Sequence, residues 1–350
     1  MRVSQEVDKK VNNDGFVMGF LLLVVAGVIN ACFTLPMKFT RKWAWENTWF
    51  AWTIFALLVL PFVVTVSTVS KIGELYSSAP AGVLVEVILF GAGWGVAQVL
   101  FGLAIDAIGI ALTFSLVMGT SAAVGSLVPL LQQHHDSLKT SAGHGVIAGV
   151  ALMIAGVAVS AVAGKQRERA TRVEALPNRR SSLGIVFALL CGLGASFVNF
   201  GISFGAPLMQ TARSLGASTF ASSNAVWLPL MLAGAIPNLL YCLWLLRANK
   251  TTSKFSGGGI AYWLLALIMA VFWFGSTVLY GVSITVLGSW GPVFGWPLFM
   301  SLIVITASLL GIFTGEWKGS GAAPLRIQWI GVSLLVFAVF CLALSSRLVI

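Results

Sequence analysis

Ten blocks of apolar residues, each long enough to cross a bilayer, constrain the fold of this chain more than any other feature. A membrane helix needs about 20 consecutive apolar residues, and the blocks lack the strict alternation of barrel strands. Only 9% of the residues are charged, whereas a soluble domain carries roughly 25%. The predicted spans are 15–37, 48–70, 81–105, 107–131, 143–163, 183–209, 221–246, 259–287, 290–314 and 328–346. We therefore predict an all-α membrane protein with ten transmembrane helices that sits in a lipid bilayer.

A basic segment, residues 164–182, divides the chain almost in half and is predicted to be a solvated linker. Five spans precede it and five follow, so the second half must insert upside down relative to the first. This five-plus-five arrangement is typical of an inverted-topology repeat, which places a substrate site near the bilayer midplane. Pro36 and Pro207, each near the end of the first span of its half, are a faint internal echo. The predicted parts are a five-helix repeat over 1–163, the linker, and a second repeat over 183–350.

The distribution of basic residues predicts the orientation. The side that holds the linker carries twice as many Lys and Arg residues as the other side, out of 21 in total. Positively charged loops stay in the cytoplasm, so both chain termini are predicted to be periplasmic, in a bacterial inner membrane. The formal charge of +10 is explained by these short loops. Nucleic acid is therefore not a predicted partner.

The sequence contains no motif for catalysis or for ATP hydrolysis. There is no GxxxxGK[ST] loop and no credible nucleophile–base pair. The four cysteines all lie inside apolar blocks without metal-ligand spacing, and the His134-His135-Asp136 cluster is interpreted as a solvated loop. We predict a transporter that is not an enzyme, has no cofactor, and is driven by an ion gradient.

Glu86 is the one Asp, Glu, Lys or Arg residue inside any of the ten predicted blocks. An ionised carboxylate within the bilayer costs a few kcal/mol or more, so such a residue is a functional hypothesis by default. Proton coupling requires a group that alternates between neutral and charged forms, which Glu86 could supply. Glu86 lies about 8 Å into its helix, so an interfacial residue without a coupling role is the alternative.

Trp94 and Gln98 follow Glu86 along one face of the same predicted helix, at i, i+4 spacing with Phe90. An indole stacks on the apolar CH face of a sugar ring, and an amide pairs with its hydroxyl rim. Trp94 and Gln98 are therefore candidate sugar-binding residues. The alternative for Trp94 is a position facing lipid or the protein core.

A second group of polar residues lies in the later spans. Asn199 is in the sixth span, and Trp273 and Tyr280 lie on one face of the eighth, together with Ser276 and Thr277. A buried amide must find a hydrogen-bonding partner in hydrocarbon. Asn199, Trp273 and Tyr280 are therefore candidate substrate-binding residues, with hydrogen bonding between helices as the alternative for the asparagine. Under the repeat the eighth span corresponds to the third, so the two could face each other across a cavity.

Five stretches spread over nearly the whole chain carry a family resemblance. They are Ala31-Cys32-Phe33 with Pro36, Lys38, Arg41, Lys42, Trp43, Trp45, Glu46 and Trp49; Phe90–Gly95; Cys191-Gly192; Trp273 with Tyr280; and Gly315-Glu316-Trp317. Together they resemble the L-rhamnose–proton symporter family of the drug/metabolite transporter superfamily. The resemblance implies ten helices in an inverted repeat and uptake of the neutral 6-deoxy sugar L-rhamnose with a proton.

The resemblance also bears on individual residues. Gln98 lies where the family has an amide, which favours a binding role. Glu46 and Glu316 match the family pattern, whereas Glu86 does not. Because Glu46 and Glu316 lie at predicted cytoplasmic helix ends, ion pairs with Lys42 and Lys318 are one interpretation of them. Proton coupling by Glu46 is the other.

The leading hypothesis from the sequence is a proton-coupled importer of L-rhamnose or a close deoxy-sugar that works by alternating access. Its predicted sugar site contains Trp94, Gln98, Asn199, Trp273 and Tyr280, with Glu86 or Glu46 carrying the proton. The alternatives are an exporter of small amphiphilic metabolites or drugs, and a membrane sensor without transport activity.

Overall fold

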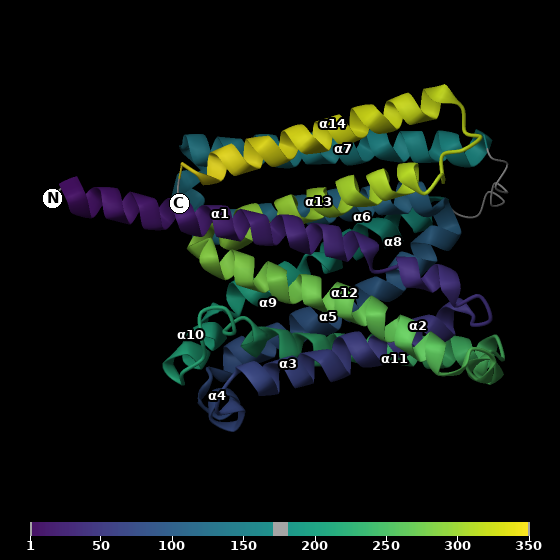
Figure 1. Cartoon of the computed structure of the whole chain (residues 1–350), viewed down its shortest axis with the longest axis horizontal. Coiled ribbons are helices and arrows are strands. Elements are labelled where there is room, and N and C mark those ends of the chain that lie inside the picture. The colour runs from purple at the N-terminus through teal and green to yellow at the C-terminus, as the bar shows by residue number, and fades with distance from the viewer. Residues whose placement is uncertain (1, 171–180, 349–350) are drawn as a thin grey trace. The chain divides into compact units, whose positions relative to one another are not determined.

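The computed structural model describes residues 2–170 and 181–348, with side chains described for 15–170 and 182–348 (Figure 1). Residues 171–180, which form most of the predicted linker, lie outside the described residues. Helix α7 (Ser141–Ala170) continues through the first residues of the range predicted as linker. The fifth helix is therefore longer than the apolar block that predicted it.

Ten helical segments of the described chain are long and apolar enough to cross a membrane, which confirms the prediction of an all-α protein with ten candidate spans. The spans are Gly15–Phe39, Trp45–Thr68, Ala81–Ile108, Ile110–Gln133, Ser141–Ala170, Ser182–Ser214, Asn224–Ala248, Gly259–Val286, Gly288–Phe313 and Ala322–Ser346. The third and fourth predicted blocks almost touch in the sequence. They form two separate helices because Gly109 adopts a positive φ of 82°, which ends the first of them.

Several spans are built from more than one helical segment. The elements in chain order are α1 (Arg2–Cys32), η1 (Leu35–Phe39), α2 (Trp45–Thr53), η2 (Ile54–Val59), α3 (Leu60–Thr68), α4 (Ile72–Ser78), α5 (Ala81–Ile108), α6 (Ile110–Gln133), η3 (His135–Lys139), α7 (Ser141–Ala170), α8 (Ser181–Ala195), α9 (Phe197–Phe204), α10 (Ala206–Ser214), α11 (Asn224–Ala248), η4 (Thr252–Gly257), α12 (Gly259–Val286), η5 (Gly288–Trp290), α13 (Gly291–Phe313) and α14 (Ala322–Ser346).

Proline explains the interruption of the second span. Segment η2 is a π-helical turn, in which the amide of Leu60 donates to the carbonyl of Phe55, five residues earlier. Pro61 follows and has no N–H to continue the α-helical ladder. The two prolines of the predicted internal echo also mark helix ends. Pro36 lies in the short 3₁₀-helix η1 that closes the first span, and Pro207 lies in the first turn of α10.

The chain forms two compact units, and each unit contains residues from both halves of the sequence. The described part of unit 1 comprises 2–27, 100–170, 181–196 and 283–348, whereas unit 2 comprises 28–99 and 197–282. Unit 2 holds most of the second and third spans and their counterparts, the seventh and eighth. Unit 1 holds the fourth and fifth with the ninth and tenth. Each unit thus pairs spans that would be equivalent under a five-plus-five repeat.

In unit 1, α7 and α14 run side by side, as Figure 1 shows. Their contact places glycines of α7 against leucines of α14. A Cβ built on Gly149 would lie 2.5 Å from Cγ of Leu342, and one on Gly156 would lie 2.8 Å from Cγ of Leu335. The neighbours of these glycines therefore include flexible side chains that fill the groove between the helices.

In unit 2, α5 and α11 approach each other backbone to backbone. A Cβ on Gly91 would collide with the carbonyl group of Leu230, and a Cβ on Gly95 would lie 2.9 Å from Cα of Gly234. These small residues let the two helices touch without intervening side chains.

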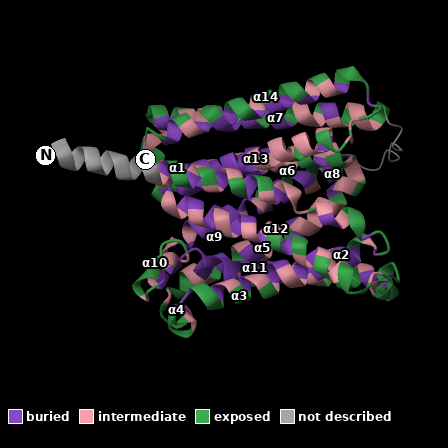
Figure 2. Ribbon diagram, viewed as in Figure 1, coloured by how far each residue is buried: buried purple, intermediate pink, exposed green. Residues whose placement is uncertain are grey.

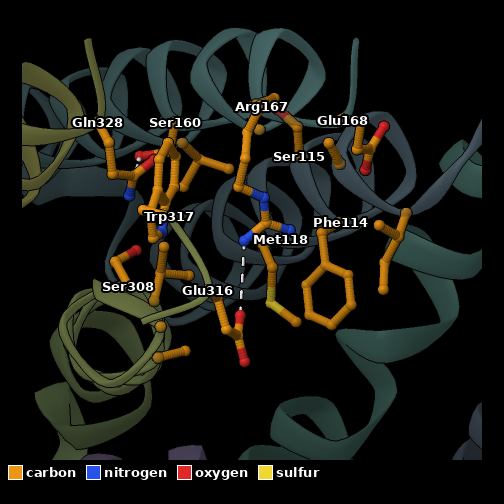
Figure 3. Close-up of a pocket in the computed structure, with 18 of the residues that line it drawn as sticks. Phe114, Ser115, Met118, Ser160, Arg167, Glu168, Ser308, Glu316, Trp317 and Gln328 are labelled. Carbon is orange, nitrogen blue, oxygen red and sulfur yellow. Dashed lines mark hydrogen bonds and ion pairs between the residues drawn. The ribbon is translucent and has the colours of Figure 1, made fainter. Parts of the chain in front are cut away.

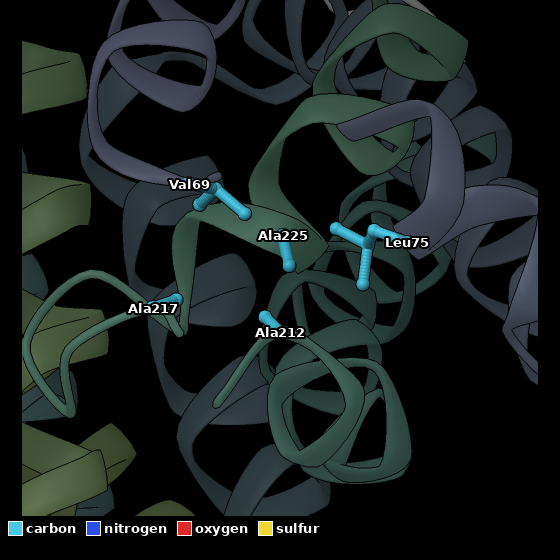
Figure 4. Close-up of a cluster of buried hydrophobic side chains, with 5 residues drawn as sticks. All are labelled: Val69, Leu75, Ala212, Ala217 and Ala225. Atoms are coloured by element: carbon cyan, nitrogen blue, oxygen red, sulfur yellow. The ribbon is translucent and has the colours of Figure 1, made fainter. Parts of the chain in front are cut away.

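One end of unit 2 is closed by a small hydrophobic cluster of Val69, Leu75, Ala212, Ala217 and Ala225 (Figure 4). These residues come from the end of α3, from α4, from α10 and the turn after it, and from the start of α11. Short side chains bring these elements close together. They also fix the start of α11, which carries polar residues of the candidate site.

Buried, half-buried and exposed residues alternate around the long helices (Figure 2). The exposed positions are strongly apolar, with Leu89 64% exposed, Phe337 66% and Phe313 78%. Such surfaces are favourable in hydrocarbon and costly in water. The chain is therefore a multi-pass membrane protein.

Candidate functional site

The candidate site is organised by one face of α12 in unit 2. Trp273, Ser276, Thr277 and Tyr280 recur at i, i+3, i+4 and i+7, the spacing that places side chains on one side of a helix. Ser276, Thr277 and Tyr280 are buried, and Trp273 is half-buried. Four neighbouring helices, α1, α2, α5 and α9, contribute contacts to this face.

The first partner is Trp94 of α5, which stacks on Trp273. Their ring centroids are 5.4 Å apart and their planes are inclined by 19°. Trp94 is only 3% exposed because its indole also packs against Gly234 of α11. These two predicted substrate-binding residues are thus in contact, and of the two indoles that of Trp273 keeps the larger accessible surface.

Tryptophans of α2 extend this aromatic group. Trp52 packs edge-on against Trp273, with 5.3 Å between the ring centroids, and the ring centroids of Trp49 and Trp52 are 4.5 Å apart. The indole N–H of Trp49 donates to Oδ1 of Asn238, 3.3 Å away, and this amide in turn donates to the carbonyl of Gly234. The sequence analysis did not propose Trp49, Trp52 or Asn238 as site residues. A signal was present in the spacing of Trp45, Trp49 and Trp52, which repeats on one helix face.

The second and third partners are asparagines from the first spans of the two halves. Asn30 donates its amide to Oγ of Ser276 at 2.8 Å, and Ser276 donates to the carbonyl of Trp273. One turn further along α12, the hydroxyl of Tyr280 donates to Oδ1 of Asn199 in α9. Asn199 and Tyr280 are almost completely buried. Two predicted site residues are therefore held together by a direct hydrogen bond.

Beside Tyr280 lie two polar groups that make no hydrogen bond to any described residue. Oγ of Ser223 and Nε1 of Trp227 are completely buried, and both lie against the bare Cα of Gly281. An unsatisfied buried polar group costs about 1–3 kcal/mol, so native proteins contain few of them outside functional sites. Trp52 also has a buried Nε1 without a hydrogen-bond acceptor among the described residues. These atoms keep unused hydrogen-bonding capacity within the described chain.

Gln98 and Glu86 lie on α5 on either side of Trp94 but are not bonded to it. Gln98 is half-buried one turn beyond Trp94. Glu86 is exposed near the start of α5, between the exposed side chains of Val85 and Leu89. An exposed carboxylate so near a helix end is compatible with both roles considered for it.

Glu46 does not make the predicted ion pair with Lys42. The carboxylate is buried and accepts hydrogen bonds from Nδ2 of Asn249 at 3.1 Å and from Oγ1 of Thr251 at 2.6 Å. Both donors lie just after α11, so Glu46 ties the start of α2 to that turn. Glu46 and its two donors are about 200 positions apart in the chain. Residues near Glu46 in the sequence could therefore suggest only Lys42 as a partner.

Glu316, the other matched carboxylate, lies in unit 1. Its Oε2 is 3.5 Å from Nη1 of Arg167 (Figure 3). The sequence analysis proposed Lys318 as the partner of Glu316 and did not consider Arg167. Its neighbour Trp317 lies under the guanidinium of Arg167, 5.1 Å from the ring centroid. Glu316 is thus tied to the end of α7.

The side chains gathered on α12 are indoles, amides and hydroxyls without fixed charge. Stacked indoles offer a flat apolar surface, and the amides and hydroxyls both donate and accept hydrogen bonds. Such an arrangement suits a neutral ligand with an apolar face and a polar edge. An ion would leave its charge without a counter-charge in this part of the unit.

The family model described as L-rhamnose-proton symport protein (RhaT) matches residues 12–346. Similar proteins include an L-rhamnose-proton symporter of Yersinia pestis (strain Pestoides F) and one of Yersinia pseudotuberculosis serotype O:1b (strain IP 31758). Each is 27% identical to this chain over 334 residues, which cover 93% of this chain and 97% of the relative.

Proposed function

Because the chain belongs to the L-rhamnose-proton symport protein family, we propose that it carries L-rhamnose or a closely related deoxy-sugar into the cell together with a proton. It is a secondary transporter and not an enzyme. It resides in the bacterial inner membrane, with both termini on the periplasmic side. It belongs to the drug/metabolite transporter superfamily. The partners are a small neutral sugar, a proton and the bilayer.

The observation that carries this proposal is the face of α12. It presents an indole with an accessible surface, Trp273, next to a buried amide–hydroxyl pair, Asn199 and Tyr280. A 6-deoxy sugar has the complementary shape, since its C–H groups and methyl form an apolar side and its hydroxyls form a polar rim. A neutral sugar also leaves no charge to be compensated.

In the proposed site Trp273 is the platform for the sugar, and Trp94 supports it from behind. Asn199 and Tyr280 bind hydroxyls on one side, and Gln98 binds others from α5. Ser223 and Trp227, which lack protein partners among the described residues, add a hydroxyl and an N–H. Alternating access exposes this site first outside and then inside.

The proton is carried by Glu86 or by Glu46. The environment of Glu46 favours a structural part for it, since two neutral donors hold its carboxylate. No hydrogen-bond donor among the described residues holds Glu86, so we assign the coupling role to Glu86. Glu86→Gln should keep the exchange of internal for external sugar at equilibrium but lose accumulation against a gradient. If accumulation persists, Glu86 is an interfacial residue.

The proposal is tested by uptake of radiolabelled L-rhamnose with and without a protonophore. Accumulation should occur only in energised cells and collapse when the protonophore is added. Trp94→Ala should abolish uptake while the protein remains in the membrane, because Trp273 loses its support. Unchanged uptake in Trp94→Ala would remove Trp94 from the site.

The exporter alternative is separated by the direction of proton movement. Adding L-rhamnose to de-energised cells should raise the external pH, because sugar and proton enter together. No response to any deoxy-sugar would contradict the proposal and favour export.

A further inference from the structure

A second pair of stacked indoles lies in unit 2, at the end of the unit where α2 begins. Trp45 and Trp49 are one turn apart on α2, and their ring centroids are 5.1 Å apart with planes inclined by 16°. In the proposed platform Trp94 and Trp273 stack at 5.4 Å and 19°. The two pairs therefore have nearly the same geometry, although one forms within a helix and the other between two helices.

In each pair one indole is held from behind by the same turn of α11. Trp94, the backing indole of the proposed platform, packs against Gly234. Trp49, the backing indole of the second pair, donates its N–H to Asn238, whose amide donates to the carbonyl of Gly234. Trp45 is left 41% exposed. The second pair therefore also presents an accessible indole on a fixed support.

Trp52 connects the two pairs. Its ring centroid lies 4.5 Å from that of Trp49 and 5.3 Å from that of Trp273. Trp52 is only 1% exposed, so it joins the pairs without offering a surface of its own. A continuous series of indoles therefore leads from the proposed sugar site to Trp45, the first residue of α2.

A tryptophan near the end of a membrane helix often belongs to the interfacial aromatic belt, which makes Trp244 a useful comparison. Trp244 lies near the end of α11, is 61% exposed and stacks on Tyr241, with 5.8 Å between the ring centroids. The start of α2 and the end of α11 are at the same end of unit 2, because Glu46 accepts a hydrogen bond from Asn249. Trp45 is distinguished by its place at the end of the indole series that reaches the proposed site.

The charges at this end of unit 2 are compatible with a neutral ligand and disfavour a cation. Arg41 and Lys42 precede α2, Lys250 and Lys254 follow α11, and all four are exposed. The carboxylate of Glu46 is buried and held by two neutral donors. A neutral sugar requires no counter-charge from any of these groups.

We propose that Trp45, backed by Trp49, is a second sugar-binding position, on which L-rhamnose stacks after it leaves Trp273. The inference rests on the proposed sugar transport, in which this end of unit 2 is cytoplasmic and the sugar passes Trp45 on release. The indole of Trp45 supplies an apolar face and one N–H. It lacks a counterpart of the amide–hydroxyl pair of Asn199 and Tyr280 on its own helix turn, so the second position binds the sugar more weakly than the first.

Fluorine NMR of the full-length protein labelled with fluorotryptophan tests the position directly, with resonances assigned from single Trp→Phe variants. L-rhamnose should shift the resonance of Trp273 and, at a concentration about tenfold higher, that of Trp45. The resonance of Trp244 should stay in place. A Trp45 resonance that moves no more than that of Trp244, while Trp273 responds, would overturn this inference alone. If neither Trp273 nor Trp45 responds, the proposed sugar function fails and this inference fails with it.

A variant of the main site separates direct binding at Trp45 from a signal relayed through the indole series. In Trp273→Ala the resonance of Trp45 should still respond to L-rhamnose, with an unchanged midpoint. Loss of the response in this variant would show that Trp45 only senses the occupied platform, and the proposal would be wrong.

Uptake kinetics measure what the second position contributes to transport. Trp45→Ala should lower the rate at saturating L-rhamnose about fivefold, because release loses an intermediate position, and should leave the midpoint of the Trp273 response unchanged. Trp45→Phe, which keeps an aromatic face, should retain most of the rate. Trp244→Ala is the matched control and should transport like the unchanged protein. An equal loss of rate in Trp45→Ala and Trp244→Ala would identify Trp45 as an ordinary belt residue and overturn the proposal.

Discussion

The two units bring their helices together by different contacts, and the difference indicates where the molecule tolerates change. In unit 2, α5 lies directly on the backbone of α11 at Gly91 and Gly95. In unit 1, Gly149 of α7 lies against the side chain of Leu342 in α14. A backbone cannot move aside, whereas a leucine can change rotamer. The α5–α11 contact at Gly91, in the unit that holds the candidate sugar site, therefore tolerates an added methyl group less well than the α7–α14 contact at Gly149.

The largest expected effect comes from adding one methyl group at each kind of contact. Gly91→Ala should destabilise the protein by about 3 kcal/mol or more, because the new Cβ meets the carbonyl group of Leu230. Gly149→Ala should cost only about 1 kcal/mol, since Leu342 can shift. Thermal unfolding and the yield of monodisperse protein measure both. A Gly91→Ala protein as stable as Gly149→Ala would erase the contrast between the units.

A second comparison concerns one tryptophan in each unit. Trp273→Ala should weaken apparent L-rhamnose affinity tenfold or more, equal to about 1.4 kcal/mol, because the sugar loses its platform. Trp296 of unit 1 donates its N–H to the carbonyl of Ser121 and is buried. Trp296→Phe should lower the Tm but leave the KM for uptake unchanged. If Trp296→Phe raised the KM as much as Trp273→Ala, the sugar site would not be confined to unit 2.

The smallest expected effects sharpen the comparison at single hydroxyl groups. Tyr280→Phe removes the donor to Asn199, and loss of one hydrogen bond of about 1 kcal/mol should raise the KM roughly fivefold. Ser126 in unit 1 donates to the carbonyl of Val293 at 2.7 Å. Ser126→Ala should cost a similar free energy of unfolding without changing the KM. Uptake kinetics and thermal melts on the same preparations separate the two outcomes.

The sequence predicts the spans well because hydrophobicity reports directly on the bilayer. The ten blocks needed only shifts of their ends, such as the extension of α7 to Ala170. Helical periodicity also predicts the face of α12 from Trp273 to Tyr280, since spacing along one helix determines which side chains share a side.

Partners across helices could not be predicted in the same way. The stacking of Trp94 on Trp273 and the hydrogen bonds from Asn249 and Thr251 to Glu46 join residues far apart in the chain. Periodicity says nothing about which neighbour a face will meet. Buried groups without partners, such as Trp227 Nε1, are recognisable only when the packing around them is known.

The π-helical turn η2 (Ile54–Val59) has a consequence for how this protein can vary in length. A π turn contains one more residue than the α-helical turn that it replaces. Deleting a single residue within it would restore a regular helix and keep Trp49 and Trp52 in phase with Thr65, which donates to the carbonyl of Asn224. The same deletion elsewhere between Trp52 and Thr65 would rotate one end by about 100° against the other. A gap of one position here, when relatives are aligned, therefore marks a change in chain length without a change in which side chains of this span meet α11 and α12.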